Sequence, residues 1–142
     1  MKNKKILVLA LIVLLAVVAI GSVCAAENTT IRGINFTIPD GFQETDNSVH
    51  DNVSTEGGLK STTDMVFYQN ETDVVGIMVL EFETPVNESV INDSGEKTNI
   101  NGVDGYLKQD DEGICSFVFI KDKCIVTIMG SNQDIIKEFV TK

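Results

Sequence analysis

One short segment of the chain contains the side-chain types of a hydrolase. Ser48, His50 and Asp51 supply a hydroxyl, an imidazole and a carboxylate, and His50 is the sole histidine. A nucleophile, its base and the group that orients the base must align through hydrogen bonds, which neighbouring loop residues do not achieve. No Gly-x-Ser-x-Gly turn exposes a serine elsewhere. We therefore interpret His50 as a surface histidine and expect no catalytic residues and no enzymatic activity.

Cofactor and metal motifs are also missing from the sequence. Gly57-Gly58 is not followed directly by the Lys-Ser/Thr pair of a phosphate-binding loop, and the cysteines and histidine lack zinc-site spacing. Asp110, Asp111 and Glu112 form a weak cation candidate, because calcium prefers closely spaced carboxylate oxygens. Three adjacent acids in a tight turn point in different directions, however. We predict no cofactor and no metal ligands beyond this weak candidate.

Cys115 and Cys124 are the cysteines that follow residue 26, and a disulfide between them is conceivable in an exported chain. If Lys121-Asp122 forms a two-residue turn, Phe119 faces Cys124 and Cys115 faces Ile128. At about 3.3 Å per residue the cysteines are then roughly 13 Å apart, beyond the reach of a disulfide. A one-residue change in loop length would place them on opposite faces. The sequence favours two buried thiols, with the disulfide as the alternative.

Six Asn-X-Ser/Thr triplets are candidate glycosylation sites, among ten asparagines after residue 26. Asn35 lies inside a predicted strand, whereas the other five lie in or beside predicted loops, where a glycan could be carried. These five are Asn28, Asn52, Asn70, Asn87 and Asn92. The alternative explanation is an exterior rich in Asn, Ser and Thr.

Residues 1–26 have the order of a secretory leader. Three lysines precede an apolar run from Ile6 to Ile20, and Cys24-Ala25-Ala26 supplies the small residues of a cleavage site. Two alternatives stay open, an uncleaved anchor and lipid attachment at Cys24. The anchor is possible because the apolar run from Ile6 to Val23 gives 18 residues, and a spanning helix needs roughly 20. In each case we predict a signal peptide or N-terminal membrane anchor over 1–26. The remaining 27–142 would form a single acidic domain, secreted or at the cell surface, outside the cytoplasmic membrane.

The charge balance after residue 26 limits the partners. Eight basic residues face 21 acidic residues there, a net charge of −13. Such a surface repels nucleic acid and anionic lipid heads, and it suits cations or basic partners. We expect no nucleic acid partner, and membrane contact only through residues 1–26 if they are not cleaved.

Alternating apolar residues and turn formers predict an antiparallel sheet built from hairpins. Ile34–Ile38 alternates apolar and polar residues and ends at Pro39-Asp40-Gly41. The polar stretch 44–62 is interpreted as a long mobile loop with at most one helical turn. The remaining strands are predicted as three hairpins, over 65–69 with 74–82, 98–101 with 105–109, and 114–120 with 123–129.

The chain is predicted to end in a helix. Ser131 can cap it, and Ile135, Ile136, Phe139 and Val140 form one apolar stripe. A sheet face and a helix stripe can share one core. The predicted fold class is therefore α+β: an antiparallel sheet with the C-terminal helix packed on one face, preceded by the N-terminal signal or membrane helix.

Two segments carry a resemblance to a known family. They are Gly33-Ile34-Asn35-Phe36-Thr37-Ile38-Pro39-Asp40-Gly41-Phe42 after the leader, and Asn101–Tyr106 followed by 117–120 and 125–128. Together they resemble small exported PsbP-like domains, and the Asn, Ile and Asp bias is similar to that of short exported proteins of methanogenic archaea. The resemblance implies an antiparallel sheet flanked by helices and an accessory or protein-interaction role. The weak helical periodicity of 44–62 departs from the family.

The functional hypothesis rests on two observations: the sequence predicts export, and it contains no catalytic motif. We expect a non-enzymatic binding module, secreted or on the cell surface, that meets another envelope or extracellular protein through a sheet edge or loops. The alternative is a glycan-bearing or cation-responsive structural component of the envelope, based on the charge and the Asn-X-Ser/Thr triplets.

Overall fold

The computed structural model describes residues 26–56 and 58–140, so the predicted signal or anchor helix lies outside the described residues. The elements, in chain order, are β1 (Glu27–Ile31), β2 (Ile34–Ile38), β3 (Gln43–Glu44), β4 (Val49–Glu56), β5 (Leu59–Gln69), β6 (Val74–Phe82), the 3₁₀ helix η1 (Glu88–Val90), β7 (Glu96–Ile100), β8 (Val103–Gln109), β9 (Cys115–Lys121), β10 (Cys124–Gly130) and α2 (Gln133–Phe139).

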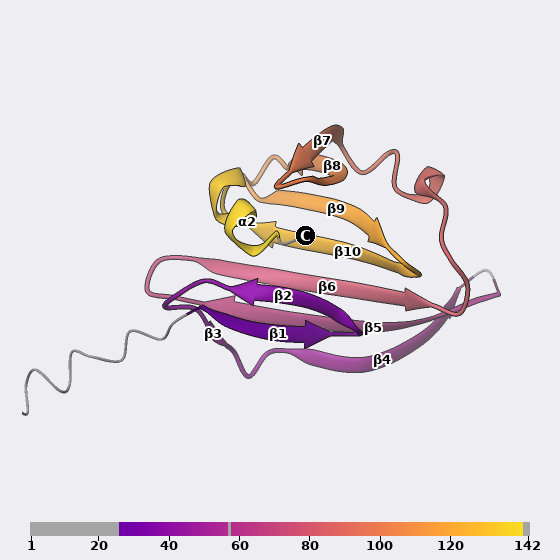
Figure 1. Cartoon of the computed structure of the whole chain (residues 1–142), viewed down its shortest axis with the longest axis horizontal. Helices are drawn as coiled ribbons and strands as arrows, with labels where there is room; N and C mark the ends of the chain where they lie inside the picture. The colour runs from indigo at the N-terminus through magenta and orange to yellow at the C-terminus, as the bar shows by residue number, and fades with distance from the viewer. Residues whose placement is uncertain (1–25, 57, 141–142) are drawn as a thin grey trace, which may run out of the picture.

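One antiparallel sheet dominates the molecule. Its strand order is β3-β5-β6-β10-β9-β8-β7, and β4 pairs with the same edge of β5 as part of this sheet. The β1–β2 hairpin forms a separate two-stranded sheet. Figure 1 shows the hairpin and α2 on the same side of the large sheet.

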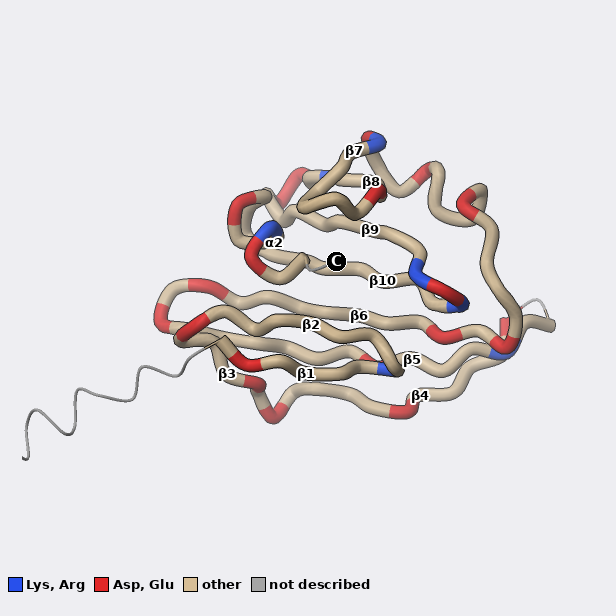
Figure 2. Tube along the Cα trace, in the orientation of Figure 1, with Lys and Arg blue, Asp and Glu red and all other residues tan. Residues whose placement is uncertain are grey.

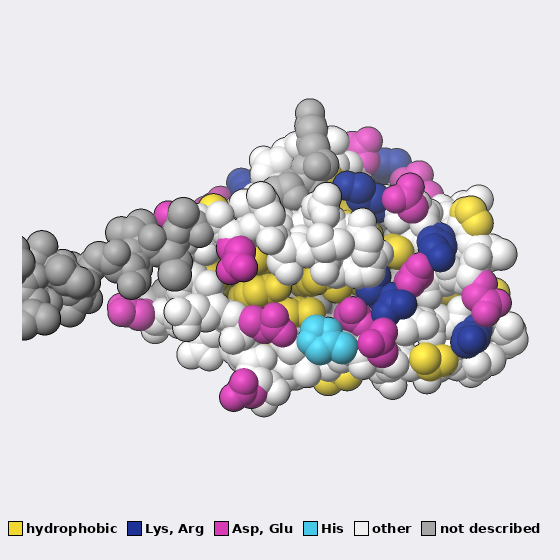
Figure 3. Space-filling view, turned by 60° about the horizontal axis from the view of Figure 1, so that its bottom comes forward, with side chains coloured by type: hydrophobic (Ala, Val, Ile, Leu, Met, Phe, Trp, Pro, Cys, Tyr) yellow, Lys and Arg dark blue, Asp and Glu magenta, His cyan; other side chains and the backbone are white. Residues whose placement is uncertain are grey.

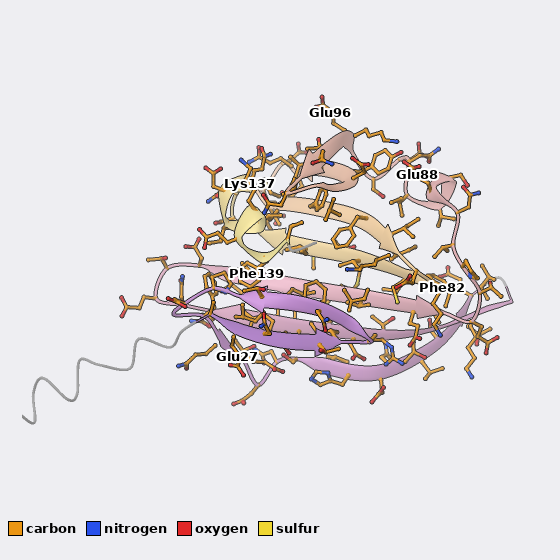
Figure 4. All side chains as sticks on the ribbon, in the orientation of Figure 1. Glu27, Phe82, Glu88, Glu96, Lys137 and Phe139 are labelled. Carbon is orange, nitrogen blue, oxygen red and sulfur yellow. The ribbon has the colours of Figure 1, made fainter. Side chains whose placement is uncertain are left out.

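The core lies between the large sheet and the layer made by the β1–β2 hairpin and α2. Its largest fully buried side chains include Phe117 and Ile128 from the sheet and Phe139 from the helix. Phe139, labelled in Figure 4, contacts the rings of Phe42 and Tyr68 at centroid distances of 5.0 and 6.1 Å. The prediction of an antiparallel sheet with a C-terminal helix packed on one face is confirmed.

The start of α2 differs from the prediction by one residue. Asn132, not Ser131, is the N-cap, and its Oδ1 accepts hydrogen bonds from the N–H groups of Asp134 and Ile135, both at 3.0 Å. The Ser131 hydroxyl instead donates to Asp73 at 2.8 Å. The helix then packs so closely on β10 that a Cβ at Gly130 would lie 2.7 Å from Ile135 Cγ2.

The prediction of a long loop over 44–62 is wrong. The segment contains β3, β4 and the start of β5, and β4 pairs with β5 from Val49–Met65 to Glu56–Leu59. Every residue of β4 is exposed. An edge strand without a buried face has no apolar alternation, so the period-2 signal was absent although the strand is formed.

The predicted hairpin turn at Lys121-Asp122 is shifted by one residue. Lys121 pairs with Cys124, which leaves Asp122 and Lys123 as the turn, and Asp122 has a positive φ of 56°. The hairpin predicted over 98–101 with 105–109 is formed by β7 and β8, and its turn is Asn101-Gly102, since both residues have positive φ and the strands pair up to Ile100–Val103.

Candidate functional site

Three methionines lie together on the side of the large sheet that faces away from α2. Side chains alternate across a sheet, so Val75, Ile77 and Val79 of β6 point into the core while the even-numbered neighbours point to the opposite side. We call this opposite side the methionine face and define it by six residues of β5, β6 and β10: Met65, Phe67, Gly76, Met78, Leu80 and Met129.

Strand register makes the methionine face a continuous surface. Gly76 pairs with Phe67 on one side and Met129 on the other, and Met78 pairs with Met65 and Thr127 in the next row. The apolar side chains of this face other than glycine are half-buried rather than buried. In the part of the chain that the structure describes, no element packs across it.

Gly76 lets the two strands beside it bring side chains across the face. A Cβ at this position would lie 3.2 Å from Phe67 Cε1 and 3.3 Å from Met129 Cε. The strand is regular there and has no bulge. Phe67 and Met129 therefore meet over the glycine and form the floor of a groove of about 390 Å³, whose wall includes the exposed side chains of Val74 and Ile114.

Acidic turns lie at the end of this groove. Asp73 of the β5–β6 turn lines the groove, and Glu71 belongs to the same turn. The β8–β9 turn contains Asp110, Asp111 and Glu112 just before Ile114, another lining residue. Hydrogen bonds from Thr72 and Ser131 lower the pKa of Asp73, so this carboxylate stays charged. Figure 2 shows acidic residues in the β5–β6 turn. The groove thus combines an apolar floor with negative edges.

The other half of the same side of the sheet is covered. Ile91, which follows η1, packs on Tyr106 and Val118, with Ile120 and Ile125 against them. The Tyr106 hydroxyl and Lys97 Nζ both donate to Glu88, at 3.1 and 2.8 Å, and so hold η1 on the sheet. The methionine face begins where this cover ends.

A network of charges centres on Arg32 in the β1–β2 turn. Its guanidinium donates to Glu81 at 2.8 Å, to Asp51 at 2.9 Å and to Asp64 at 3.2 Å, and Lys123 bonds Glu81 at 2.7 Å. These bonds raise the pKa of Arg32 and lower that of Glu81. Because each of the three carboxylates is paired with Arg32, the network positions the hairpin on the sheet rather than offering a free acid or base.

The structure separates the hydrolase-like residues. The Ser48 hydroxyl donates to the Thr45 carbonyl at 3.1 Å and accepts from the Phe67 N–H at 3.2 Å. His50 lies 3.5 Å from Glu44 and 3.8 Å from Asp64, while Asp51 pairs with Arg32. His50 is half exposed, and its neighbours are carboxylates rather than the serine.

Cys115 and Cys124 are buried free thiols in the structure. The shifted turn changes the expected partners, since Cys124 faces Lys121 and Cys115 faces Gly130. Both thiols lie on the core side at opposite ends of the β9–β10 hairpin. Burial raises the pKa of Cys124, which keeps that thiol protonated and unreactive.

The weak cation candidate forms a self-contained turn. Asp110 Oδ1 accepts from the N–H groups of Glu112 and Ile114 at 3.0 and 2.8 Å, so this carboxylate is used by its own backbone, and Asp111 is exposed. Among the residues described, no group of three His, Cys, Asp or Glu side chains is placed to hold a metal ion.

The candidate glycosylation sites lie mainly on the exterior. Asn28, Asn52, Asn87 and Asn92 are exposed, and so is Asn35 in β2. Asn70 is half-buried, and its Oδ1 accepts from the N–H groups of Thr72 and Asp73 at 2.8 and 2.7 Å. Glycosylation at Asn28, Asn52, Asn70, Asn87 or Asn92 stays a prediction.

Sequence reasoning missed the methionine face, although one signal for it was present. The run Val74–Leu80 is apolar at both alternating positions, as in a strand that contacts apolar groups on both sides. The Arg32 network had no such signal, because its partners lie 19, 32 and 49 residues away along the chain.

Comparison of the chain with protein-family models, curated proteins and solved structures found no match. The resemblance to PsbP-like domains therefore stays a prediction. Across residues 26–56 and 58–140, no helix has the length and apolar character needed to cross a membrane.

Proposed function

We propose that this protein is an exported, non-enzymatic binding module whose methionine face docks an apolar segment of another envelope or extracellular protein. The observation that carries the proposal is the open half of the sheet, where three methionines and Phe67 are only half-buried although the opposite side is fully packed. Large apolar patches on the surface mark interaction sites. Methionine is suited to such a site, because its unbranched side chain adapts to different partners.

The acidic turns specify the chemistry of the partner. Asp73 lines the groove, and four further carboxylates belong to the β5–β6 and β8–β9 turns, which also supply the lining residues Thr72 and Ile114. Residues 27–142 carry a net charge of −13. A second copy of this chain or an anionic lipid surface would be repelled. The occupant we propose is therefore an apolar peptide segment with lysine or arginine at its ends.

Binding of synthetic peptides to the full-length chain tests this function. Two peptides share one apolar centre and carry either lysines or glutamates at both ends. We expect the lysine peptide to bind more tightly. V74D and M78D should weaken its binding at least about tenfold, since V74D places a charge in the groove and M78D places one on the methionine face beside it. E71Q/E112Q should reduce the preference for lysine over glutamate ends.

The control variant is N47D, which adds the same charge at an exposed position between β3 and β4. Thermal unfolding of each variant establishes that it is folded. V74D should disturb the fold less than M78D, because Val74 is already 53 % exposed. Equal binding by wild type and V74D, or binding to anionic lipid vesicles in place of the lysine peptide, would overturn the proposal.

A further inference from the structure

A second hollow lies on the other side of the molecule, between the β1–β2 hairpin and the β3–β5 edge. It has a volume of about 260 Å³ and is lined by residues of both sheets and of the segment that joins them: Glu27, Thr29, Ile38, Pro39, Phe42, Gln43, Glu44 and Tyr68. Figure 3 shows apolar side chains at the bottom of a hollow with acidic side chains around it. Its size is slightly below the usual range for drug-sized ligands, about 300–1,000 Å³.

The floor of this hollow is aromatic and fixed in place. Phe42 is 8 % exposed and Tyr68 is 4 % exposed. Phe139 of α2 contacts both rings and meets Phe42 edge to face at an interplanar angle of 84°. Aromatic rings attract cations through their negative faces. A rigid pair of rings therefore favours a cationic group with an apolar stem.

The lining of the hollow carries two carboxylates, Glu27 and Glu44, and none of its lining residues within 26–56 and 58–140 is a lysine or arginine. Burial raises the pKa of the Tyr68 hydroxyl, and the charges of Glu44 and Glu27 raise it further. The phenol therefore stays neutral, and the negative charge of the lining comes from the two carboxylates. His50, 3.5 Å from Glu44, is the neighbouring group that would compete for that carboxylate when protonated.

We propose that this hollow binds an alkyl ammonium group, of the size of a lysine side chain. The stem lies against Phe42 and Tyr68 while the ammonium is held between Glu27 and Glu44. This site is independent of the methionine face, since the two share no residues. The ammonium could come from a free amine or from a lysine of a protein partner.

NMR titration of the full-length chain tests this site. The probes are Nα-acetyl-lysine amide, n-butylamine and Nα-acetyl-norleucine amide, which has a similar stem without the charge. We expect the two amines to shift the ring signals of Tyr68 but not those of Tyr106, whereas the norleucine compound causes no saturable shift. E27Q/E44Q should weaken binding at least about tenfold.

E96Q/E138Q is the control, because it removes two exposed carboxylates from β7 and α2. Saturation by n-butylamine as well as lysine amide indicates a site for free amines, and saturation by lysine amide alone indicates a protein lysine. Equal binding of the norleucine compound, or unchanged binding in E27Q/E44Q, would overturn the inference. V74D should leave this titration unchanged, because Val74 is not part of the hollow. Failure of the amine site can therefore be told apart from failure of the proposed function.

Discussion

At the scale of single residues, Arg32 connects the hairpin layer to the large sheet. It stands in the β1–β2 turn with a φ of 48°, and Gly33 beside it has a φ of 80°, so the turn directs the guanidinium toward acids of β4, β5 and β6. The side chains of Arg32, Asp64 and Glu81 are 18, 13 and 23 % exposed. At this low exposure, loss of one partner leaves a poorly solvated charge.

Replacement of Glu81 should change how stability depends on pH. The pKa of Glu81 is below its ordinary value of 4.5 because Lys123 and Arg32 donate hydrogen bonds to the charged carboxylate. Such a group stabilises the fold above its unfolded pKa, and the contribution disappears as the pH falls through the lower folded pKa. We expect E81Q to flatten the decline in the free energy of unfolding between about pH 5 and about pH 3.

Urea unfolding at a series of pH values measures this effect. The flattening should be partial, because Glu88 and Asp73 also have lowered pKa values and remain in the variant. E96Q, which removes an exposed carboxylate of β7, serves as the control. The role given to the Arg32 network is wrong if E81Q and the wild type lose stability in parallel as the pH falls.

At the scale of elements, the cap of α2 depends on a single side chain. Asn132 satisfies two N–H groups of the first helical turn, whereas Ser131 makes an exposed contact to Asp73. Removal of an N-cap costs about 1 kcal/mol. We expect N132A to lower the free energy of unfolding by about this amount and S131A by less, as measured by urea unfolding. A larger loss in S131A would show that Ser131 is the cap.

Elements with a buried face could be predicted from the sequence, and those without one could not. Ile34–Ile38 and Val74–Phe82 match β2 and β6, because alternation or continuous apolar character marks strands that contact the core. β4 is exposed along its whole length and is held by backbone pairing to β5. The position of the β9–β10 turn was missed by one residue because Lys121, Asp122 and Lys123 are all polar.

The same contrast applies to the candidate sites. The apolar character of β6 was visible in the sequence, but the meeting of Met65, Met78 and Met129 depends on the pairing of β5, β6 and β10. β10 lies beside β6 although 41 residues separate Phe82 from Cys124. The spacing of residues within one segment contains no information about that pairing. The hollow lined by Phe42 and Tyr68 is likewise formed by segments that are separated along the chain.

At the scale of the whole molecule, the fold is packed on one side and open on the other. The hairpin and α2 bury one side of the sheet, and the segment around Ile91 covers part of the opposite side. The methionine face, on the side of the sheet away from the hairpin and α2, is only half-buried. Charge repulsion opposes self-association of a strongly acidic chain, which is consistent with an open apolar face and with the basic partner that we propose.

The most direct test of this account is oxidation of the methionines, in purified full-length protein and in intact cells that produce it. Hydrogen peroxide converts accessible methionine to its sulfoxide, which peptide mass spectrometry measures at each position. We predict that Met65, Met78 and Met129 oxidise readily in the purified protein and are protected in the cells, where the partner covers them. Equal oxidation of the three methionines in both samples would contradict the account, because the face would then be uncovered where the protein acts.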